Sequence, residues 1–296
     1  MCKVVRLRVW QEGSQVTDRK TALITGCSTG IGRVAAETFQ RSDWNVIASM
    51  RRPEAERELG VLERVLVTAL DVTDPDSIDA AIRAGVERFG TVDCLVNNAG
   101  LGGHALLEQS SDRMIRAMYE TNVFGPIRTT RAVLPILRRQ GGGTVVNVTS
   151  MGGLMGLPLD SIYCSTKFAM EGFTEALALE CAPLGIRVCS VAPGAYLTTA
   201  FSANTIDELD AGEPSVVAYA RRVRAHMQRV ISGGGGTTAD PQEVADVIYR
   251  CATSDMPTHN QVGRDAEMLM GLMRAGPRQA FVDQVAAMLL PAGETA

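Results

Sequence analysis

The sequence predicts a doubly wound α/β fold, in which a parallel β-sheet carries helices on both faces within a single domain. Short apolar runs alternate with amphipathic segments along the 296 residues. The first apolar run ends in a glycine-rich turn that leads directly into a helical pattern. No linker divides the chain into two large domains, and no repeat of about 20–50 residues is present.

Six short apolar runs, each bounded by turn residues, are predicted strands. Helical patterns separate them, and residues 51–63 are expected to be a loop that leads into a helix. Thr73 or Asp74, followed by Pro75, is expected to start the helix of 73–90. The predicted strands are 21–26, 44–50, 65–72, 93–100, 141–150 and 187–194, and the predicted helices are 32–42, 73–90, 110–140 (one helix or a pair), 161–183 and 241–252.

The composition argues against several classes of protein. A net charge of −4 gives no basic surface for nucleic acid or for an anionic membrane. The seven cysteines form no C-x-x-C pair, which favours small core residues in a reducing cytoplasm over a disulfide framework. The three histidines lie far apart, so no metal site is predicted. No apolar run reaches the roughly 18–20 residues of a membrane span.

The first predicted strand is followed by Thr-Gly-Cys-Ser-Thr-Gly-Ile-Gly. Gly26, Gly30 and Gly32 have the spacing G-x-x-x-G-x-G and stand between this strand and the first helix. Glycines at such a turn let the backbone approach a pyrophosphate, whose charge lies at the helix N-terminus. We therefore predict a dinucleotide site, with a plain strand–helix turn as the alternative.

The end of the second predicted strand is where this fold distinguishes NAD from NADP. An Asp or Glu there would accept the ribose 2′-hydroxyl of NAD, but this chain has Met50, Arg51 and Arg52. A guanidinium can bind a 2′-phosphate through two hydrogen bonds, so NADP(H) is favoured over NAD(H). The alternative is that both arginines are solvated loop residues. Asp71 lies where the adenine edge would be, or it caps the next turn.

Tyr163 and Lys167 lie four residues apart in a helical segment and so share one helix face. Taken alone, this pair is typical of a solvated lysine beside a half-buried tyrosine. Beside a dinucleotide site it is better interpreted as a tyrosine acid/base, whose pKa of about 10 the ammonium would lower. Cys164 is one position round the helix and is predicted to pack rather than to react.

Six motifs resemble, in order and spacing, the classical short-chain dehydrogenases/reductases over about residues 20–200. They are TGCSTGIG, NNAG (97–100), TNVFG (121–125), NVTS (147–150), YCSTK (163–167) and PGAYLT (193–198). VIASMRRP, YCSTKFAMEGFTEALALE and VGRDAE are most similar to the branch of 17β-hydroxysteroid and retinol dehydrogenases. The resemblance implies a Rossmann fold and hydride transfer between a nicotinamide and a carbonyl carbon.

The resemblance also implies a role for individual residues. Tyr163 would be the general acid/base with Lys167 as its partner, Ser150 would polarise the carbonyl, and Asn122 would support a proton relay. By themselves, Ser150 could merely end a strand and Asn122 could cap or bend a helix. The residues expected to bind the cofactor are Gly26, Ser28, Thr29, Gly30, Ile31, Gly32, Arg51, Arg52, Asp71, Val72, Asn98, Ala99, Gly100, Tyr163, Lys167, Pro193, Gly194 and Thr198.

Two positions depart from the family pattern. Thr29 stands where many NADP-binding members have a basic residue, so a 2′-phosphate would depend on Arg51 and Arg52. The Asp-Gly-Gly that commonly ends the final strand is missing near 259–266.

The family pattern divides the chain into three regions. Residues 1–19 are an N-terminal extension, either an extra strand or a tail contributed by the choice of start codon. Residues 20–262 are expected to be a Rossmann-fold domain that binds cofactor and substrate, with 196–240 as a substrate lid because 202–240 are polar and glycine-rich at their end. Residues 263–296 are predicted to be a C-terminal helical extension.

The substrate wall is expected to be apolar and rich in methionine, from MGGLMGLPL (151–159) together with Tyr196, Leu197 and Phe201. This favours a steroid-, retinoid- or polyketide-like ketone and its alcohol. The alternatives are a non-catalytic nicotinamide-sensing regulator, which would not need Tyr163 and Lys167, a sugar-nucleotide epimerase or dehydratase, and a non-enzymatic scaffold. Apolar stripes on 110–140 and 161–183 predict a homodimer or homotetramer.

Overall fold

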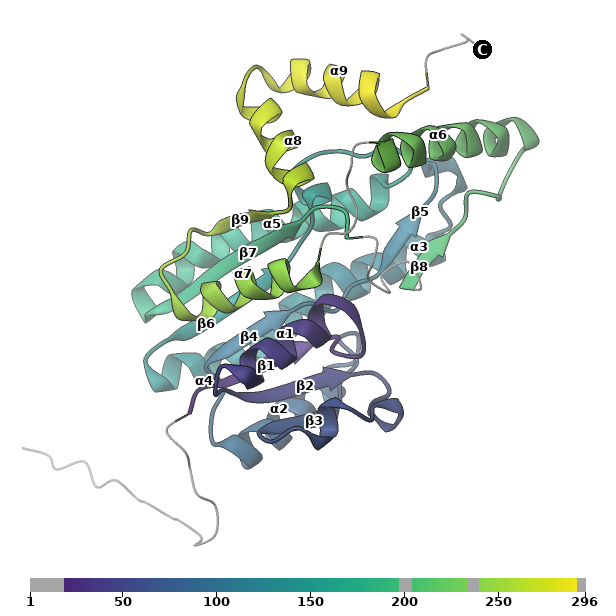
Figure 1. Ribbon diagram of the computed structural model, residues 1–296. Helices are drawn as coiled ribbons and strands as arrows, with labels where there is room; N and C mark the ends of the chain where they lie inside the picture. The colour runs from purple at the N-terminus through teal and green to yellow at the C-terminus, as the bar shows by residue number, and fades with distance from the viewer. Residues whose placement is uncertain (1–18, 197–203, 234–239, 292–296) are drawn as a thin grey trace, which may run out of the picture.

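The central element of the computed structural model is a seven-stranded sheet with the order β3-β2-β1-β4-β6-β7-β9, and every neighbouring pair is parallel (Figure 1). The structure describes residues 19–196, 204–233 and 240–291. The predicted doubly wound fold is confirmed. The strands are β1 (Thr21–Thr25), β2 (Asn45–Met50), β3 (Val65–Ala69), β4 (Cys94–Asn97), β6 (Gly143–Val148), β7 (Ile186–Pro193) and β9 (His259–Val262).

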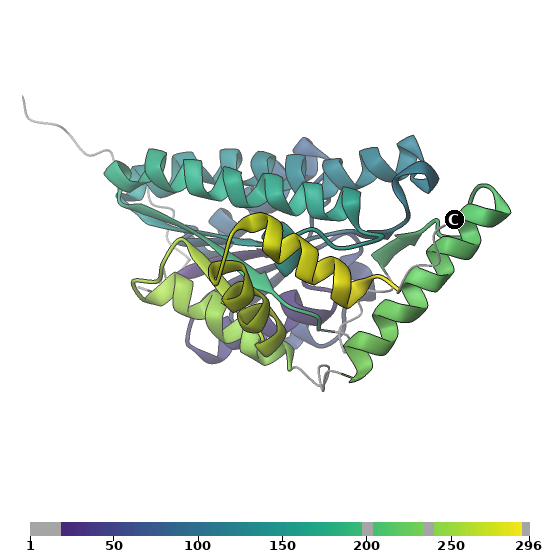
Figure 2. The ribbon, with the colours of Figure 1, turned by 90° about the horizontal axis from the view of Figure 1, so that it is seen from above.

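Helices cover both faces of this sheet because successive side chains of each strand point to opposite sides. Ala22 and Ile24 of β1 pack with α1 (Gly30–Arg41) and α7 (Pro241–Thr253). Leu23 packs on the other face with α2 (Pro75–Phe89), α4 (Gly125–Gln140) and α5 (Ser161–Cys181). Figure 2 shows these two helical layers on either side of the strands.

The strand order reverses direction between β1 and β4. The chain runs from β1 outward to β2 and β3, and then returns to place β4 on the other side of β1. Open parallel sheets bind ligands in the crevice at such a switch point, beyond the carboxyl ends of the strands. The turns after β1, β4 and β6 therefore lie where a ligand site is expected.

Three segments differ from the predictions made above. Residues 51–63 form two 3₁₀ turns, Pro53–Ala55 and Leu59–Val61, and no α-helix, because Pro53 and Gly60 interrupt the helical pattern. Residues 202–240, expected to be a polar loop, contain the helix α6 (Pro214–Gly233), which buries Ala220 and Val223. The polar strand β9 had no apolar run to predict it.

The helical stretch of 110–140 is interrupted rather than continuous. It consists of α3 (Asp112–Tyr119), a π-helical turn over Glu120–Phe124, and α4. Two short strands, β5 (Gly102–His104) and β8 (Thr205–Asp207), form a separate parallel pair, in which β5 contacts α3. The predicted N-terminal extension lies, except for Arg19, outside the described residues.

The chain ends in two helices, α8 (Arg264–Arg274) and α9 (Arg278–Leu289), drawn in yellow in Figures 1 and 2. Together with Met155 and Met227 they build an apolar cluster that includes Leu269, Phe281 and Val285. Among the described residues, none of the helices has both the length and the apolar character needed to cross a membrane.

Gly271 in α8 offers a test of local helix stability. This position is exposed to solvent, and a Cβ placed on Gly271 would meet no atom within 4 Å. We expect Gly271→Ala to raise the free energy of unfolding by about 1 kcal/mol, because alanine has the higher helix propensity and loses less chain entropy. Chemical denaturation would measure this. A destabilised Gly271→Ala variant would contradict the helical geometry described for α8.

Candidate active site

Hydrogen bonds join the glycine turn after β1 to the end of β4. The Asn98 side-chain amide donates to the carbonyl oxygens of Thr25 at 2.9 Å and Gly26 at 3.1 Å. In return, the Thr25 hydroxyl accepts the backbone N–H groups of Asn98 and Ala99, each at 3.0 Å. Asn98 and Ala99 were predicted to line the cofactor, whereas Thr25 was not singled out. Its only sequence signal is that it is the last residue of the first strand.

Two glycines of this turn are required by the close packing. Gly26 has a φ of +75°, which a residue with a Cβ rarely adopts. A Cβ on Gly32 would lie 2.3 Å from the Asn98 amide nitrogen and 2.4 Å from the Gly26 carbonyl oxygen. The turn therefore brings bare backbone to the crevice at the end of β1, as a cradle for a pyrophosphate requires.

The first turn of α1 leaves its backbone donors open to an anion. Thr29 precedes the helix, and its side chain makes no capping hydrogen bond. No acidic residue stands in the first turn, and both Ser28 and Thr29 are exposed. The helix N-terminus at Gly30 and Ile31 thus has the polarity that suits a phosphate.

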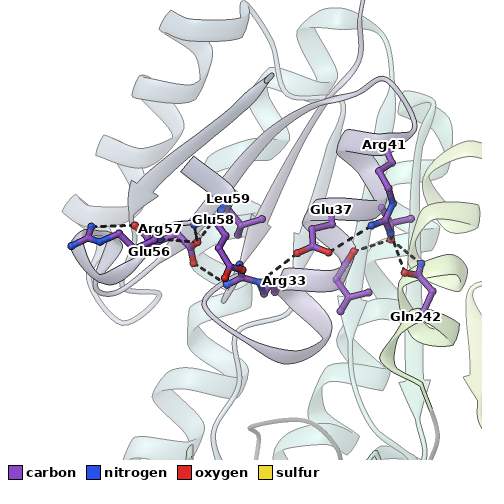
Figure 3. Close-up of polar contacts among 10 residues, drawn as sticks. Arg33, Glu37, Arg41, Glu56, Arg57, Glu58, Leu59 and Gln242 are labelled. Carbon is purple, nitrogen blue, oxygen red and sulfur yellow. Dashed lines mark hydrogen bonds and ion pairs between the residues drawn. The ribbon is translucent and has the colours of Figure 1, made fainter. Parts of the chain in front are cut away.

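The predicted adenosine-ribose selector lies at the end of β2. Arg51 and Arg52 are exposed, and neither side chain forms a hydrogen bond or an ion pair with another described residue. Arg33, one turn into α1, is instead bound by three carboxylates, those of Glu37, Glu56 and Glu58 (Figure 3). Arg51 and Arg52 are therefore the two guanidinium groups at this edge that remain free to meet a ligand.

Glu56 organises the loop that follows Arg51 and Arg52. One of its oxygens accepts the backbone N–H groups of Arg57, Glu58 and Leu59 at 2.7–3.0 Å, and the other meets the Arg33 guanidinium at 3.1 Å. Burial alone would raise the pKa of the Glu56 carboxyl, but these hydrogen bonds and Arg33 lower it overall. This carboxylate is fully engaged and is not placed to accept a ribose hydroxyl.

Asp71 and Val72, predicted near the adenine, lie in the turn after β3. The Asp71 carboxylate accepts the Thr73 backbone N–H at 2.9 Å and its hydroxyl at 2.8 Å. It therefore caps this turn, as the alternative interpretation held, while a contact with adenine stays a prediction. Val72 is buried under Gly125, where a Cβ would come within 2.8 Å of it.

Tyr163 and Ser150 come together although they belong to different elements. Ser150 follows β6, Tyr163 lies in the first turn of α5, and their hydroxyls share a hydrogen bond. Burial raises the pKa of Tyr163 above its ordinary value, and the hydrogen bond with Ser150 opposes this only in part. We expected Lys167 to lower the pKa of Tyr163, but the partial burial of the ring has the larger effect.

Lys167 is buried beside Tyr163 and faces the glycine-lined crevice. Its exposed fraction is 6%, its amine donates to the Val148 carbonyl at 3.1 Å, and it lies 5.7 Å from the centre of the Tyr163 ring. A Cβ on Gly100 would be 3.9 Å from the amine. Burial lowers the pKa of Lys167 to about 8, with the Glu171 carboxylate acting in the opposite direction. The amine thus exchanges its proton close to neutrality.

Asn122 occupies the π-helical turn between α3 and α4. Its amide oxygen accepts the Leu101 backbone N–H at 2.8 Å, and its amide nitrogen donates to the Leu101 carbonyl at 2.8 Å and to the Thr166 hydroxyl at 3.1 Å. Such π-helical turns are frequent at functional sites because they redirect a side chain. Here the turn joins the segment after β4 to α5, beside Gly100 and Lys167.

Pro193 and Gly194, predicted to hold the nicotinamide end, lie at the carboxyl end of β7. Asp265 of α8 packs directly over them: its carboxylate accepts the Ala195 backbone N–H at 2.8 Å. A Cβ on Gly194 would come within 2.0 Å of an Asp265 oxygen. The motif VGRDAE, which stands where the family commonly has Asp-Gly-Gly, thus supports this turn. Thr198 lies outside the described residues.

Cys164 packs against the loop after Ser150, as predicted. A Cβ on Gly152 would lie 3.3 Å from its sulfur. Burial raises the pKa of the Cys164 thiol to about 12, so the thiol keeps its proton near neutrality. A thiol in this form is a poor nucleophile.

The chain matches the short chain dehydrogenase family over residues 20–209. The oxidoreductase YusZ of Bacillus subtilis is 38% identical over 245 residues, covering 80% of this chain and 85% of its own length. Human 17-beta-hydroxysteroid dehydrogenase type 1 is 34% identical, covering 81% of this chain and 76% of its own. Retinol dehydrogenase 8 of Bos taurus is 33% identical, with coverages of 80% and 79%.

Solved structures of the family superpose on this chain. A short-chain dehydrogenase of Streptomyces avermitilis has a TM-score of 0.76 at 34% identity, covering 92% of this chain and 94% of its own. ElxO with bound NADP has a TM-score of 0.67 at 31% identity, covering 82% and 97%. A 3-ketoacyl-(acyl-carrier-protein) reductase of Brucella melitensis, complexed with NADH, has a TM-score of 0.68 at 28% identity, covering 82% and 96%.

The resemblance noted in the sequence is therefore confirmed, together with relatives among the hydroxysteroid and retinol dehydrogenases. Enzymes of this fold and family bind NAD(P)(H), and the bare backbone cradle at Gly26 and Gly32 fits such a dinucleotide. The chain belongs to the short-chain dehydrogenase family and is an oxidoreductase.

Proposed function

We propose that this oxidoreductase uses NADP(H) to interconvert a hydrophobic secondary alcohol and its ketone, with Tyr163 as general acid/base. The observation that carries the proposal is the meeting of Ser150, Tyr163 and Lys167 at the edge of the glycine-lined crevice. A regulator that only sensed the dinucleotide would need the glycine turn but not a half-buried tyrosine and a buried lysine beside it.

Each of the three side chains, those of Ser150, Tyr163 and Lys167, has a separate role at the carbonyl oxygen. When bound, the nicotinamide supplies the hydride to the carbonyl carbon or accepts it from the alcohol. Ser150 donates a hydrogen bond to the oxygen, where negative charge develops. Tyr163, whose pKa is raised by the partial burial of its ring, donates the proton that the reduced oxygen needs. After this transfer, the Lys167 ammonium stabilises the Tyr163 phenolate. A proton from solvent then restores the neutral tyrosine.

Asn122 and the segment after β4 complete this arrangement. Asn122 holds the Leu101 backbone and the Thr166 hydroxyl of α5, so it fixes Gly100 relative to Lys167. We propose that Asn122 supports the proton relay from solvent to Tyr163. Asn98, Ala99, Pro193 and Gly194 are proposed to line the cofactor, together with Thr198, of which the structure describes nothing.

The preference for NADP(H) is supported by Arg51 and Arg52. Both stand exposed at the end of β2, while the nearby Glu56 carboxylate is already engaged by three backbone N–H groups and Arg33. ElxO, with NADP bound, and the Brucella reductase, with NADH, are each about equally similar to this chain. Similarity to these two structures therefore does not distinguish the cofactors, and the proposed preference for NADP(H) depends on the charges of Arg51 and Arg52.

We expect Arg51→Ala to weaken NADPH binding about tenfold to a hundredfold and to leave NADH binding unchanged. Hydrogen bonds between charged groups contribute about 1.5–3 kcal/mol, and only NADPH carries the 2′-phosphate. Fluorescence titration of each reduced cofactor would measure this. Arg139→Ala, in the exposed last turn of α4 before β6, is the matched control. Equal losses for both cofactors would contradict the proposed role of Arg51.

A hydrophobic substrate is supported by the apolar segment that follows Ser150. Met151, Met155 and Leu157 pack against Met227 of α6 and against the side chains of α8 and α9. Methionine side chains adapt to irregular apolar shapes, which suits a steroid-, retinoid- or polyketide-like carbonyl. The relatives named for retinol and 17-beta-hydroxysteroid oxidation support the same class.

The organisation of the chain is part of the proposal. We propose that residues 20–262 form the cofactor- and substrate-binding domain, with 196–240 as a lid, and that 263–296 form a helical extension.

A homodimer or homotetramer is supported by exposed apolar side chains on the helices of the α4–α5 face, namely Phe124, Phe168 and Leu179. The described cysteines are buried and free, which fits a cytoplasmic enzyme.

The proposal is tested by cofactor oxidation against a panel of lipophilic ketones, with NADPH and NADH compared at equal concentration. We expect turnover with at least one steroid, retinoid or polyketide-like ketone, and a higher kcat/KM with NADPH. Tyr163→Phe is the control for background oxidation. A purified chain that binds NADPH but reduces no ketone would support the sensing regulator instead, and preference for NADH would contradict the role of Arg51.

A further inference from the structure

Three consecutive residues at the end of β6 contact one face of α5. The Val148 carbonyl accepts a hydrogen bond from the Lys167 amine at 3.1 Å. The Thr149 hydroxyl donates a short hydrogen bond to Glu171, and the Ser150 hydroxyl shares a hydrogen bond with Tyr163. Residues 163, 167 and 171 are one helical turn apart, so they form a single stripe on α5.

Glu171 is the member of this stripe to which the proposed function gives no role. It is buried, with an exposed fraction of 6%, although glutamate is rarely buried without partners. One carboxylate oxygen accepts the Thr149 hydroxyl, while the other accepts the Ser190 hydroxyl at 2.8 Å and meets His259 Nδ1 at 2.7 Å. Glu171 thus ties α5 to β6, β7 and β9.

The loop after Ser150 closes tightly over the same stretch of helix. A Cβ on Gly153 would lie 2.9 Å from the Lys167 carbonyl oxygen and 3.2 Å from Cγ of Glu171. The Thr149 backbone N–H also donates to the Val191 carbonyl of β7 at 2.8 Å. Water is therefore kept away from both charged side chains, and their electrostatic interaction is weakly screened.

We propose that Glu171 is a positioning residue of the active site: its carboxylate holds the end of β6, and hence Ser150, against α5, and keeps the Lys167 amine charged. This inference rests on the proposed role of Lys167. A buried ammonium without a nearby carboxylate would lose its proton at neutral pH, because burial disfavours the charged form. Glu171 opposes this effect of burial on the Lys167 amine.

The other ionisable groups around this stripe are few. Tyr163, Cys164 and Glu175 lie on α5, and Asp160 precedes the helix and acts on Tyr163. His259 lies on β9, with its side chain 33% exposed and its Nε2 at 3.7 Å from Glu175. The facing residues of β6, β7 and the loop after Ser150 that make these contacts are Val148, Thr149, Ser190 and Gly153, none of which titrates. Glu171 is therefore the carboxylate through which the charge of Lys167 is set.

Titration of the lysine itself tests the proposal without any substrate. The sequence contains only three lysines, Lys3, Lys20 and Lys167, so an isotope-labelled lysine side chain can be followed by NMR and assigned with Lys3→Arg and Lys20→Arg. We expect the Lys167 amine to titrate near pH 8 and, in Glu171→Gln, about one pH unit lower. Glu175→Gln is the matched control: the same change one turn away, at a side chain that is 72% exposed, should leave the titration unaltered.

The same shift should appear in the pH profile of the reaction. A fall of one unit reduces the charged fraction of Lys167 at pH 8 from about one half to about one tenth, so kcat/KM should fall about fivefold there and change little at pH 6. The melting temperature is recorded alongside. A wild-type lysine titration in folded Glu171→Gln would overturn the proposed control of charge.

Thr149→Val tests the positioning of Ser150 separately from the charge of Lys167. It also keeps the proposal testable if Glu171→Gln does not fold. It removes the hydroxyl that binds Glu171 but retains both charges. We expect an unaltered lysine titration, an unaltered NADPH dissociation constant and a severalfold lower kcat. A wild-type kcat would overturn the positioning of Ser150 through Thr149. If the wild-type enzyme reduces no ketone, the proposed function fails, while the lysine titration still decides the role of Glu171.

Discussion

Tyr163→Phe is expected to lower kcat/KM for ketone reduction about 10²–10⁴-fold, the usual contribution of a general acid. Phenylalanine preserves the ring that packs near Met118 and Ile162 but has no proton to donate. The folded state should keep its stability, since the variant loses one hydrogen bond with Ser150 without adding bulk. NADPH binding should likewise persist, because the glycine turn and Arg51 remain intact.

Steady-state kinetics with the most reactive ketone of the panel, together with fluorescence titration of NADPH, would measure both quantities. Tyr119→Phe is a matched control, because the Tyr119 hydroxyl also donates to a hydroxyl of α5, that of Ser165, at 3.0 Å. The control should retain activity. Cofactor consumption that survives Tyr163→Phe at the wild-type rate would defeat the assigned mechanism.

Gly32→Ala is expected to weaken dinucleotide binding at least about tenfold and to lower the free energy of unfolding by about 1–3 kcal/mol, as overpacking does. The added Cβ would meet the Asn98 amide nitrogen at 2.3 Å and the Gly26 carbonyl oxygen at 2.4 Å. One of these is backbone, so the turn itself must move. The backbone cradle for the pyrophosphate would move with it.

Titration of NADPH fluorescence and chemical denaturation would measure the two effects. Gly271→Ala makes the same change in α8, where there is free space, and should leave cofactor binding unaltered. A Gly32→Ala variant that binds NADPH as tightly as the wild type would show that the turn does not carry the dinucleotide.

Most of the sheet could be predicted because its strands are buried on both faces and are therefore continuous apolar runs. Ala22, Leu23 and Ile24 are all inaccessible to solvent. The sequence His259–Val262 has no such run, and it becomes a strand only because β7 offers a free edge with which it pairs. The sequence predicts a loop where α6 lies, because the neighbouring polar and glycine-rich residues obscure the apolar positions that pack with Leu209.

Spacing along the chain predicts which residues share one helix face but not how exposed that face is to solvent. The four-residue interval between Tyr163 and Lys167 correctly places them on one face, yet an interval contains no information about how dry that face is. Glu171, four residues further, looks like an ordinary surface partner for a lysine. Its burial depends on the loop after Ser150 and on β9, which lie elsewhere in the sequence.

The contact between Asp265 and the turn at Gly194 has a consequence for the order in which the enzyme matures during translation. The ribosome makes β1 to β7 before residue 265, so Ala195 lacks the carboxylate that accepts its N–H until α8 has been made. Because Pro193 and Gly194 are proposed to hold the nicotinamide end, we expect full cofactor binding at this turn only after α8 has been made. Fusions or truncations that remove α8 would leave the newly made protein at that unfinished stage.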